Sequence, residues 1–313
     1  MVRAAVMHPA IYGPFHRVCW PHSVDATATI LLLATAVLGG LLGSLTGLGG
    51  GVVIVPVLVL LFKVDLPYAI GASLVAVVAT SSGAAAAFVR EGFTNVRVAM
   101  VLEVATVAGA LLGAAIATWM SRDVVAVVFG LVAIWSAWGA AKAPRPLPAV
   151  VVQDPEGPRP LAERLRLAST YPTPEGPVAY SVFRVPAAFA TMIAAGVLSA
   201  LIGVGSGFVK VIAMDRIMRL PFKVSTTTSN FMIGVTASAS AGVYLHRGQL
   251  LPALCGPVAL GALLGSLLGA RLLPKVKVRP LRLLFAVVVA IAGVQMIMRA
   301  FTGSMESVPE AGN

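Results

Sequence analysis

Charged residues are scarce in this chain of 313 residues. They make up 11% of the sequence, hydrophobic residues make up 58%, and the mean hydropathy is +0.93. So few polar residues cannot cover the surface of a soluble globular domain. The composition therefore predicts an all-α polytopic membrane protein.

Cysteine and histidine are also rare. The two cysteines, Cys19 and Cys255, lie far apart, and no Cys-x-x-Cys or Cys/His spacing indicates a redox pair or a metal site. No apolar stretch contains a Ser/His pair, paired aspartates or His-Glu-x-x-His, which argues against an intramembrane enzyme. We expect no enzyme activity, no cofactor and no metal site.

Basic residues outnumber acidic ones and give a net charge of +11. They are scattered through short loops without interleaved aromatic residues, a pattern that favours topogenic charge over nucleic-acid binding. We therefore expect a lipid bilayer as partner and no nucleic acid, and the composition leaves the oligomeric state open.

Eight apolar stretches are long enough to cross a bilayer as helices. They cover residues 26–46, 68–89, 98–120, 123–140, 186–202, 224–245, 250–272 and 281–301. They define an N-terminal tail (1–25), a first transmembrane repeat (26–141), a second repeat (185–301) and a C-terminal tail (302–313). The Pro-rich segment 142–184 reads as a solvated linker with one or two helical turns around 161–168.

The two repeats share a glycine-rich corner. GLGGG ends at Gly51 and GVGSG ends at Gly207, and each is followed by an apolar segment of about twelve residues (52–62 and 208–219) and then by Leu-Pro. GALLG motifs follow at Gly109 and Gly261, so the landmarks recur in order at offsets of 152 to 156 residues. We conclude that the chain is duplicated, and each short segment spans only about half a membrane.

The distribution of Lys and Arg predicts that the halves are inverted. If each half crossed the membrane four times, the two sides of the membrane would carry 12 and 10 basic residues, which is no clear bias. If the chain reverses direction once more at each corner, the two sides carry 6 and 16 basic residues, and Lys210 lies inside a short segment. The positive-inside rule then places the linker in the cytoplasm and both termini outside the cell membrane.

The sequence resembles the sulfite exporter TauE/SafE family of membrane transporters, also called the toluene sulfonate uptake permease family. The resemblance rests on three stretches, which are GLGGG followed by Val-Ile-Val-Pro, Leu-Pro followed by Ala-Ser-Leu (72–74), and the second corner followed by Ser-Thr-Thr-Thr-Ser-Asn (225–230). It implies secondary transport of a small, often sulfur-containing anion such as sulfite or a sulfonate. A passive anion channel shares the architecture and stays open as an alternative, as does, with less support, an intramembrane enzyme.

The corners are candidate anion sites because a helix that begins inside a membrane presents unpaired N–H groups and a partial positive charge. Glycines let the backbone turn and let a substrate approach closely, and paired broken helices in two inverted halves are typical of a transporter site. The alternative is that the glycines only pack helices tightly. The predicted substrate-binding residues at the corners are Gly49, Gly50, Gly51, Gly205, Ser206 and Gly207.

Polar residues in apolar stretches add further candidates. Ser73, Thr80, Ser81 and Ser82 correspond approximately to 226–230 and Thr236, and from these sets we select Ser73, Thr227 and Asn230 as substrate contacts. Glu103 is a candidate for a coupling proton. Lys210 either compensates the charge of an anion or pairs with Asp215.

Overall fold

The computed structural model describes residues 26–46, 50–90, 92–141, 160–173, 176–203, 205–272 and 278–302. The first repeat forms α1 (Ala26–Thr46), α2 (Gly51–Leu60), α3 (Leu66–Arg90), α4 (Val96–Ile116) and α5 (Arg122–Ala141). The second forms α7 (Val185–Ile202), α8 (Gly207–Ile212) with a π-helical turn η2 (Ala213–Ile217), α9 (Phe222–His246), α10 (Pro252–Leu272) and α11 (Val278–Phe301). Between them lie α6 (Pro160–Arg164), β1 (Ser169–Thr173) and β2 (Gly176–Tyr180).

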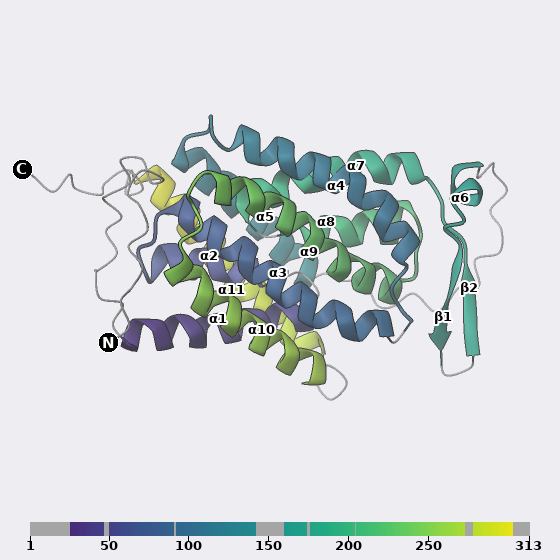
Figure 1. Cartoon of the computed structure of the whole chain (residues 1–313), viewed down its shortest axis with the longest axis horizontal. Coiled ribbons are helices and arrows are strands. Elements are labelled where there is room, and N and C mark those ends of the chain that lie inside the picture. The colour runs from purple at the N-terminus through teal and green to yellow at the C-terminus, as the bar shows by residue number, and fades with distance from the viewer. Residues whose placement is uncertain are drawn as a thin grey trace, which may run out of the picture.

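The all-α membrane architecture is confirmed. Each of the eight predicted apolar stretches is a helix, and the segment after each corner is short, as expected. Among the described residues, six helices are long and apolar enough to cross a membrane, namely α1, α3, α4, α5, α7 and α10. The helix α9 is as long as α3, but its serines and threonines lower its hydropathy; it packs centrally against α3, α4 and α8 (Figure 1).

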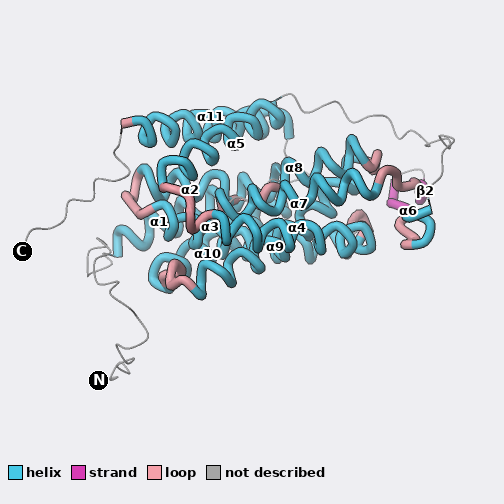
Figure 2. The backbone as a smooth tube through the Cα atoms, turned by 90° about the horizontal axis from the view of Figure 1, so that it is seen from above, coloured by secondary structure: helices cyan, strands magenta, loops and turns pink. Residues whose placement is uncertain are grey.

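The two halves interlock through their first helices. The helix α1 packs along α10 of the second half, and α7 packs in the same way along α4 of the first half. The pairs α3–α10 and α9–α4 repeat this exchange, while α3 packs on its counterpart α9 and α5 packs on its counterpart α11 (Figure 2). This reciprocal pattern of contacts is the one expected when two halves are related by a two-fold axis.

The repeated GALLG motifs make the close contacts in this exchange. A Cβ atom at Gly109 or Gly113 would overlap the carbonyl oxygen of Ile193 or Val197 on α7. A Cβ atom at Gly261 or Gly265 would likewise overlap the carbonyl oxygen of Leu33 or Val37 on α1. At these positions the glycines act as packing residues that bring two membrane helices together.

The loops gather at two opposite ends of the bundle. At one end, Arg97 donates to the Arg166 carbonyl, the Lys223 ammonium lies 3.7 Å from the Phe93 ring centre, and the Arg219 guanidinium lies 5.8 Å from the ring centre of Phe183. This end therefore brings together the linker, the α3–α4 loop and the segment between η2 and α9.

The opposite end collects the remaining loops that the structure describes. Arg122 pairs with Asp65 at 3.5 Å, and Arg299 donates to the Val59 carbonyl oxygen at 3.2 Å. The α9–α10 loop reaches the same end, because Gln249 lies against Gly71 near the start of α3. The start of α1 and the end of α11 also lie there, opposite the hairpin (Figure 1).

The second part of the linker differs from the expected solvated coil. The helical turn α6 agrees with the prediction, but β1 and β2 pair as an antiparallel hairpin that the sequence analysis did not predict. Tyr171 and Tyr180 are buried, and the Tyr180 hydroxyl accepts a hydrogen bond from the Asn95 carboxamide at 2.8 Å. Asn95 also caps α4 by accepting from the Val98 N–H, so one side chain joins the hairpin to the transmembrane bundle.

Candidate functional site

The first corner turns directly into a buried short helix. Gly50 precedes α2 with right-handed backbone angles (φ −69°), so positive φ is not what requires glycine there. A Cβ atom at Gly50 would instead lie 3.0 Å from the carbonyl oxygen of Gly39 on α1. Close approach of two backbones therefore explains this glycine.

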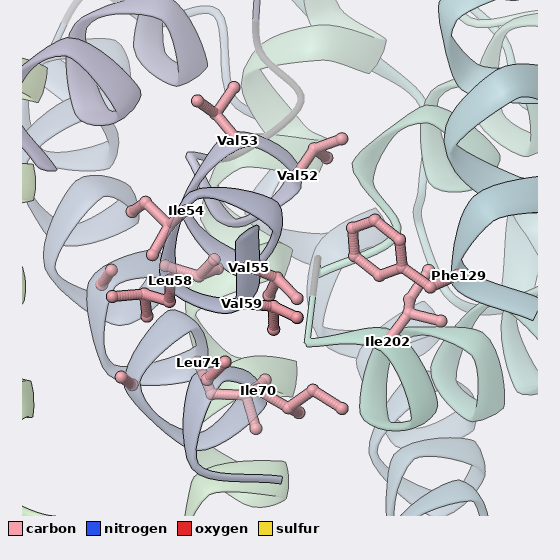
Figure 3. Packing of buried hydrophobic residues seen from close by; sticks show 14 of the residues in the cluster. Val52, Val53, Ile54, Val55, Leu58, Val59, Ile70, Leu74, Phe129 and Ile202 are labelled. Carbon is pink, nitrogen blue, oxygen red and sulfur yellow. The ribbon is translucent and has the colours of Figure 1, made fainter. Parts of the chain in front are cut away.

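The helix α2 is enclosed by apolar side chains. Eight of its ten residues are buried, and no side chain caps its N-terminus. In Figure 3 its valine, isoleucine and leucine side chains point in all directions, toward Ile70 and Leu74 of α3, Phe129 of α5 and Ile202 of α7. The helix α2 begins at the buried Gly51 and ends at the end of the bundle opposite the hairpin, where Leu61 is exposed and the Arg299 guanidinium binds the Val59 carbonyl near the helix C-terminus.

The second corner uses left-handed backbone instead. Gly203 ends α7 with φ +68°, Gly205 has φ +75°, and Ser206 has φ +45° immediately before α8. Ser206 is buried, and among the described residues its hydroxyl has no hydrogen-bond partner and no side chain caps α8. The chain then continues from α8 into η2, and π-helical turns of this kind are frequent at functional sites.

The structure brings the two corners into contact. The buried Ser73 hydroxyl donates to the Gly203 carbonyl oxygen at 2.7 Å and lies 3.3 Å from the carbonyl oxygen of Gly51. A Cβ atom at Gly51 would lie 2.6 Å from the same Gly203 oxygen. Ser73, which sequence analysis selected as a substrate contact, therefore joins the two corners in the structure.

The second-half counterpart of Ser73 is a residue that sequence analysis did not select. Ser229 donates to the Gly207 carbonyl oxygen at 3.1 Å, and it follows Gly207 by 22 residues, as Ser73 follows Gly51 by 22. The offset between the corner glycines could have identified it. The offset between the Leu-Pro pairs, two residues shorter, pointed to Thr227 instead.

Thr227 is not with the other candidates. Its hydroxyl lies within hydrogen-bond distance of the carbonyl oxygens of Phe93, Lys223 and Val224, at 3.0–3.1 Å. It therefore joins the start of α9 to the α3–α4 loop at the hairpin end. Gly49 lies outside the described residues, and Gly205 and Gly207 lie at the second corner as predicted.

A small cavity, lined in part by polar side chains, lies between α1, α3 and α9 beside the corners. Its lining residues are Gly43, Ser44, Thr80, Ser81, Ala84, Asn230 and Ile233. The centre of a water-sized sphere can move within about 10 Å³, which is room for about one water molecule. Ile233 also lies against Gly205, so the cavity and the second corner share a wall.

Asn230, which sequence analysis selected as a substrate contact, lies in the wall of this cavity. The Ser81 hydroxyl donates to its backbone carbonyl oxygen at 2.5 Å, which holds α3 and α9 together at this point. Among the described residues, no hydrogen bond engages the Asn230 side-chain amide. Because Asn230 lines the cavity and its amide has no such bond, the amide is available to a molecule that enters the cavity.

Glu103 and Lys210 meet through a threonine. The Lys210 ammonium donates to the Thr236 hydroxyl at 2.5 Å, and that hydroxyl donates to Glu103 Oε1 at 2.5 Å. Lys210 is fully buried and Glu103 is 6% exposed. The structure thus places Lys210 beside Glu103 and not in an ion pair with Asp215, and Thr236 is the connecting residue that sequence analysis did not select.

Comparisons with known proteins agree with this architecture. The family model of the sulfite exporter TauE/SafE matches residues 32–296. The chain is 25% identical over 280 residues to the probable membrane transporter protein YunE of Bacillus subtilis (strain 168). The aligned region covers 86% of this chain and 97% of that protein. No solved structure matches. From the corner helices, the interlocked halves and a family match that spans nearly all transmembrane helices, we conclude that this chain belongs to the sulfite exporter TauE/SafE family of membrane transporters.

Proposed function

We propose that the protein is a secondary transporter of a small sulfur-containing anion such as sulfite or a sulfonate. The observation that carries the proposal is the contact between the two corners through Ser73. Two short helices begin there, inside the bundle, from opposite halves of the duplicated chain. Broken helices that meet in this way form the substrate sites of many secondary transporters.

The chemistry of the corners favours an anion. The first N–H groups of a helix have no partner within the helix and carry a partial positive charge. Neither α2 nor α8 has a side-chain cap at its start, and both starts are buried. We propose that the backbone of Gly49, Gly50, Gly51, Gly205, Ser206 and Gly207, with the side chains of Ser73 and Asn230, holds the anion.

A carrier fits the size of the cavity better than a channel does. The cavity beside the corners has room for about one water molecule, which is less than a sulfite ion needs. Entry of the anion therefore requires a movement of the surrounding helices, and a movement tied to binding is the basis of alternating access. A passive channel would instead need a pore that stays continuous while ions pass.

The proposed substrate class rests on the description of the family. Its model is described as sulfite exporter, whereas the relative from Bacillus subtilis is described only as a probable membrane transporter. We therefore propose sulfite, sulfate and sulfonates as the first anions to test, with the direction of transport to be measured.

We propose a topology with inverted halves, a cytoplasmic linker and external termini in the cell membrane. The two-ended arrangement of the loops supports it, because the loops that meet at the hairpin end are those that the 6 to 16 division places together. With four crossings per half, Lys223 and Phe93 would belong to opposite ends. The positive-inside rule assigns the hairpin end, which has more basic residues, to the cytoplasm.

Counterflow in proteoliposomes tests the function. Vesicles loaded with unlabelled sulfate, sulfite or methanesulfonate should accumulate the same labelled anion transiently, because a carrier exchanges substrates, whereas a channel shows no such trans-stimulation. Asn230→Leu should lower this exchange at least tenfold, and Ser82→Ala, on the exposed side of α3, should leave it intact. Absence of counterflow for all three anions, with the protein correctly inserted, would reject the proposal.

A further inference from the structure

The two halves differ in charge one turn beyond their corners. Lys210 stands three residues after Gly207, whereas the residue three positions after Gly51 is Ile54. Ile54 is buried, as Lys210 is, so both side chains lie inside the protein. Only the second half therefore carries a buried positive charge at this position.

Of the two residues that link to Lys210, one has an equivalent in the other half and one does not. Thr236 follows Ser229 by seven residues and matches Thr80, so both halves keep a threonine on the long helix after the corner. Glu103, six residues before the GALLG glycine of its half, matches Cys255. The second-half corner thus has a hydroxyl between a base and an acid, and the first-half corner has the matching hydroxyl in the wall of the cavity.

We infer that Glu103, Thr236 and Lys210 form a proton-binding site that couples the movement of the anion to a proton gradient. This inference rests on the proposed function as an anion transporter. It assigns different tasks to the two sites, since the cavity beside Thr80 lies next to the proposed anion site and the charged cluster around Thr236 binds the coupling ion.

The geometry gives the proton a place to bind. Glu103 Oε1 accepts from the Thr236 hydroxyl, whereas Glu103 Oε2 is buried and accepts no hydrogen bond from the part of the chain that the structure describes. A buried charged oxygen without a partner is unfavourable. A proton that binds Oε2 forms an O–H bond there and removes the negative charge.

The threonine also connects the acid with the base. Its oxygen accepts from the ammonium of Lys210. Its single proton lies within reach of Glu103 Oε1 at 2.5 Å and of the Met232 carbonyl oxygen at 3.0 Å, and the shorter distance assigns the proton to Glu103. A proton can pass from Lys210 Nζ to this oxygen as the hydroxyl proton passes to Glu103 Oε1. That transfer leaves a neutral amine and a neutral acid, and the total number of protons does not change.

Loading one further proton changes the net charge of the cluster. Without it, the charges of Lys210 and Glu103 cancel; with it, the cluster carries one positive charge. Lys210 lies in the first turn of α8, next to the second corner, so this charge attracts an anion bound there. Proton and anion therefore favour each other's binding, and we expect them to move together in one direction.

The same arrangement disfavours sodium as the coupling ion. The Lys210 ammonium already occupies the Thr236 oxygen, and a second cation at this oxygen would be repelled at close range in a poorly solvated interior. A proton needs only one oxygen, and Glu103 Oε2 supplies it.

Other charged and titratable side chains on the surrounding elements lie toward the helix ends. The helix α7 has none, η2 carries Asp215 and Arg216, α4 has Arg97 in its first turn, α9 has Lys223 in its first turn with Tyr244 and His246 in its last, and α3 has Tyr68 and Arg90 near its ends. Glu103 lies eight residues beyond the Asn95 cap, about 12 Å along α4 at 1.5 Å per residue. Proton uptake by the cluster is therefore attributable to Glu103 and Lys210.

Uptake driven by a pH gradient tests the inference. Proteoliposomes with an acidic exterior and a clamped membrane voltage would be given labelled sulfate or methanesulfonate. These anions stay ionised, whereas sulfite takes up a proton near neutral pH and would confuse the result. We expect the gradient to raise accumulation at least tenfold in the parent protein, and an inward sodium gradient to have no effect.

Replacing the acid should remove this response selectively. Glu103→Gln should accumulate no more anion with the gradient than without it, yet retain counterflow, which needs no net movement of protons. The double variant Glu103→Gln/Lys210→Met removes both charges together and guards against misfolding from an unpaired charge. Thr236→Val should also lose the response and Thr236→Ser should keep it, while Glu163→Gln, a carboxylate exposed on α6, serves as control.

Proton binding can also be measured without transport. Addition of sulfate to the purified, weakly buffered parent protein should cause uptake of about one proton per bound anion, and Glu103→Gln should abolish it. Gradient-driven accumulation that persists in Glu103→Gln, or a response to sodium, would overturn the inference while counterflow still supported an anion carrier. Failure of counterflow in the parent would instead reject the proposed function and the inference with it.

Discussion

Replacing Ser73 with alanine removes the side chain that joins the two corners. Its hydroxyl donates to the Gly203 carbonyl at the end of α7, and among the described residues no backbone N–H donates to that oxygen. Ser73 is fully buried, so bulk water does not replace the lost donor. Leaving a buried carbonyl without a partner costs about 1–3 kcal/mol.

This cost should appear in substrate binding if the joined corners form the anion site. If binding requires the contact between the corners, 1–3 kcal/mol corresponds to an approximately 5- to 150-fold weaker affinity. The assay is thermal stabilisation of the purified protein by increasing sulfate or sulfite, because a ligand that binds the folded state raises its melting temperature by mass action. The half-saturating concentration should rise by at least fivefold in Ser73→Ala.

A matched serine on the same helix provides the control. The Ser82 hydroxyl bonds the Val78 carbonyl within α3 on an exposed face, so Ser82→Ala should change stability by no more than about 0.5 kcal/mol. If Ser73→Ala melts lower than the parent but binds the anion with parental affinity, Ser73 only supports the fold. If both its melting temperature and its affinity equal those of Ser82→Ala, the argument from the unpaired carbonyl is refuted.

Two further predictions concern the corners and the topology. Ser206→Val should lower anion affinity more than Ser206→Gly, because a β-branched residue is strained at φ +45° while glycine is not; equal affinities of the two variants in the thermal-shift assay would contradict this. Gly50→Val should also lower anion affinity, but here the cause is the close approach of the added Cβ atom to the Gly39 carbonyl oxygen. For the topology, Cys19 should react with an impermeant thiol reagent on intact cells, and Ser169→Cys in a chain without Cys19 should react only after permeabilisation, since Ser169 is exposed on the hairpin. Labelling of Ser169→Cys in intact cells would reverse the proposed orientation.

The helices and the corners could be predicted from the sequence because their signals are local. A run of apolar residues long enough to cross a membrane needs no knowledge of its neighbours, and each predicted run is a helix in the structure. The same holds for the glycine clusters that stop α7 and precede α2 and α8. Ser73 and Asn230 could be selected as candidates because polar groups in apolar helices are few.

The hairpin could not be predicted in this way. Its strands are short, interrupted by Pro172 and Pro177, and lie in a segment whose composition indicates a linker. The hairpin is held by burial of Tyr171 and Tyr180 and by the hydrogen bond from Asn95 to Tyr180, two residues that lie 85 positions apart in the chain. Tertiary contacts outweigh local propensity in such segments.

The sequence alone determined the membrane class, the duplication and the position of the two corners, because hydropathy and internal repetition are properties of the chain itself. Only the tertiary structure decided which polar groups meet. Lys210 contacts Thr236, 26 residues away, and Thr236 contacts Glu103, 133 residues away, whereas the sequence offered Asp215 as a nearer partner for Lys210. The packing of α4, α8 and α9 selects these partners, since a charge buried among helices must be matched by whichever polar group the neighbouring helix places beside it.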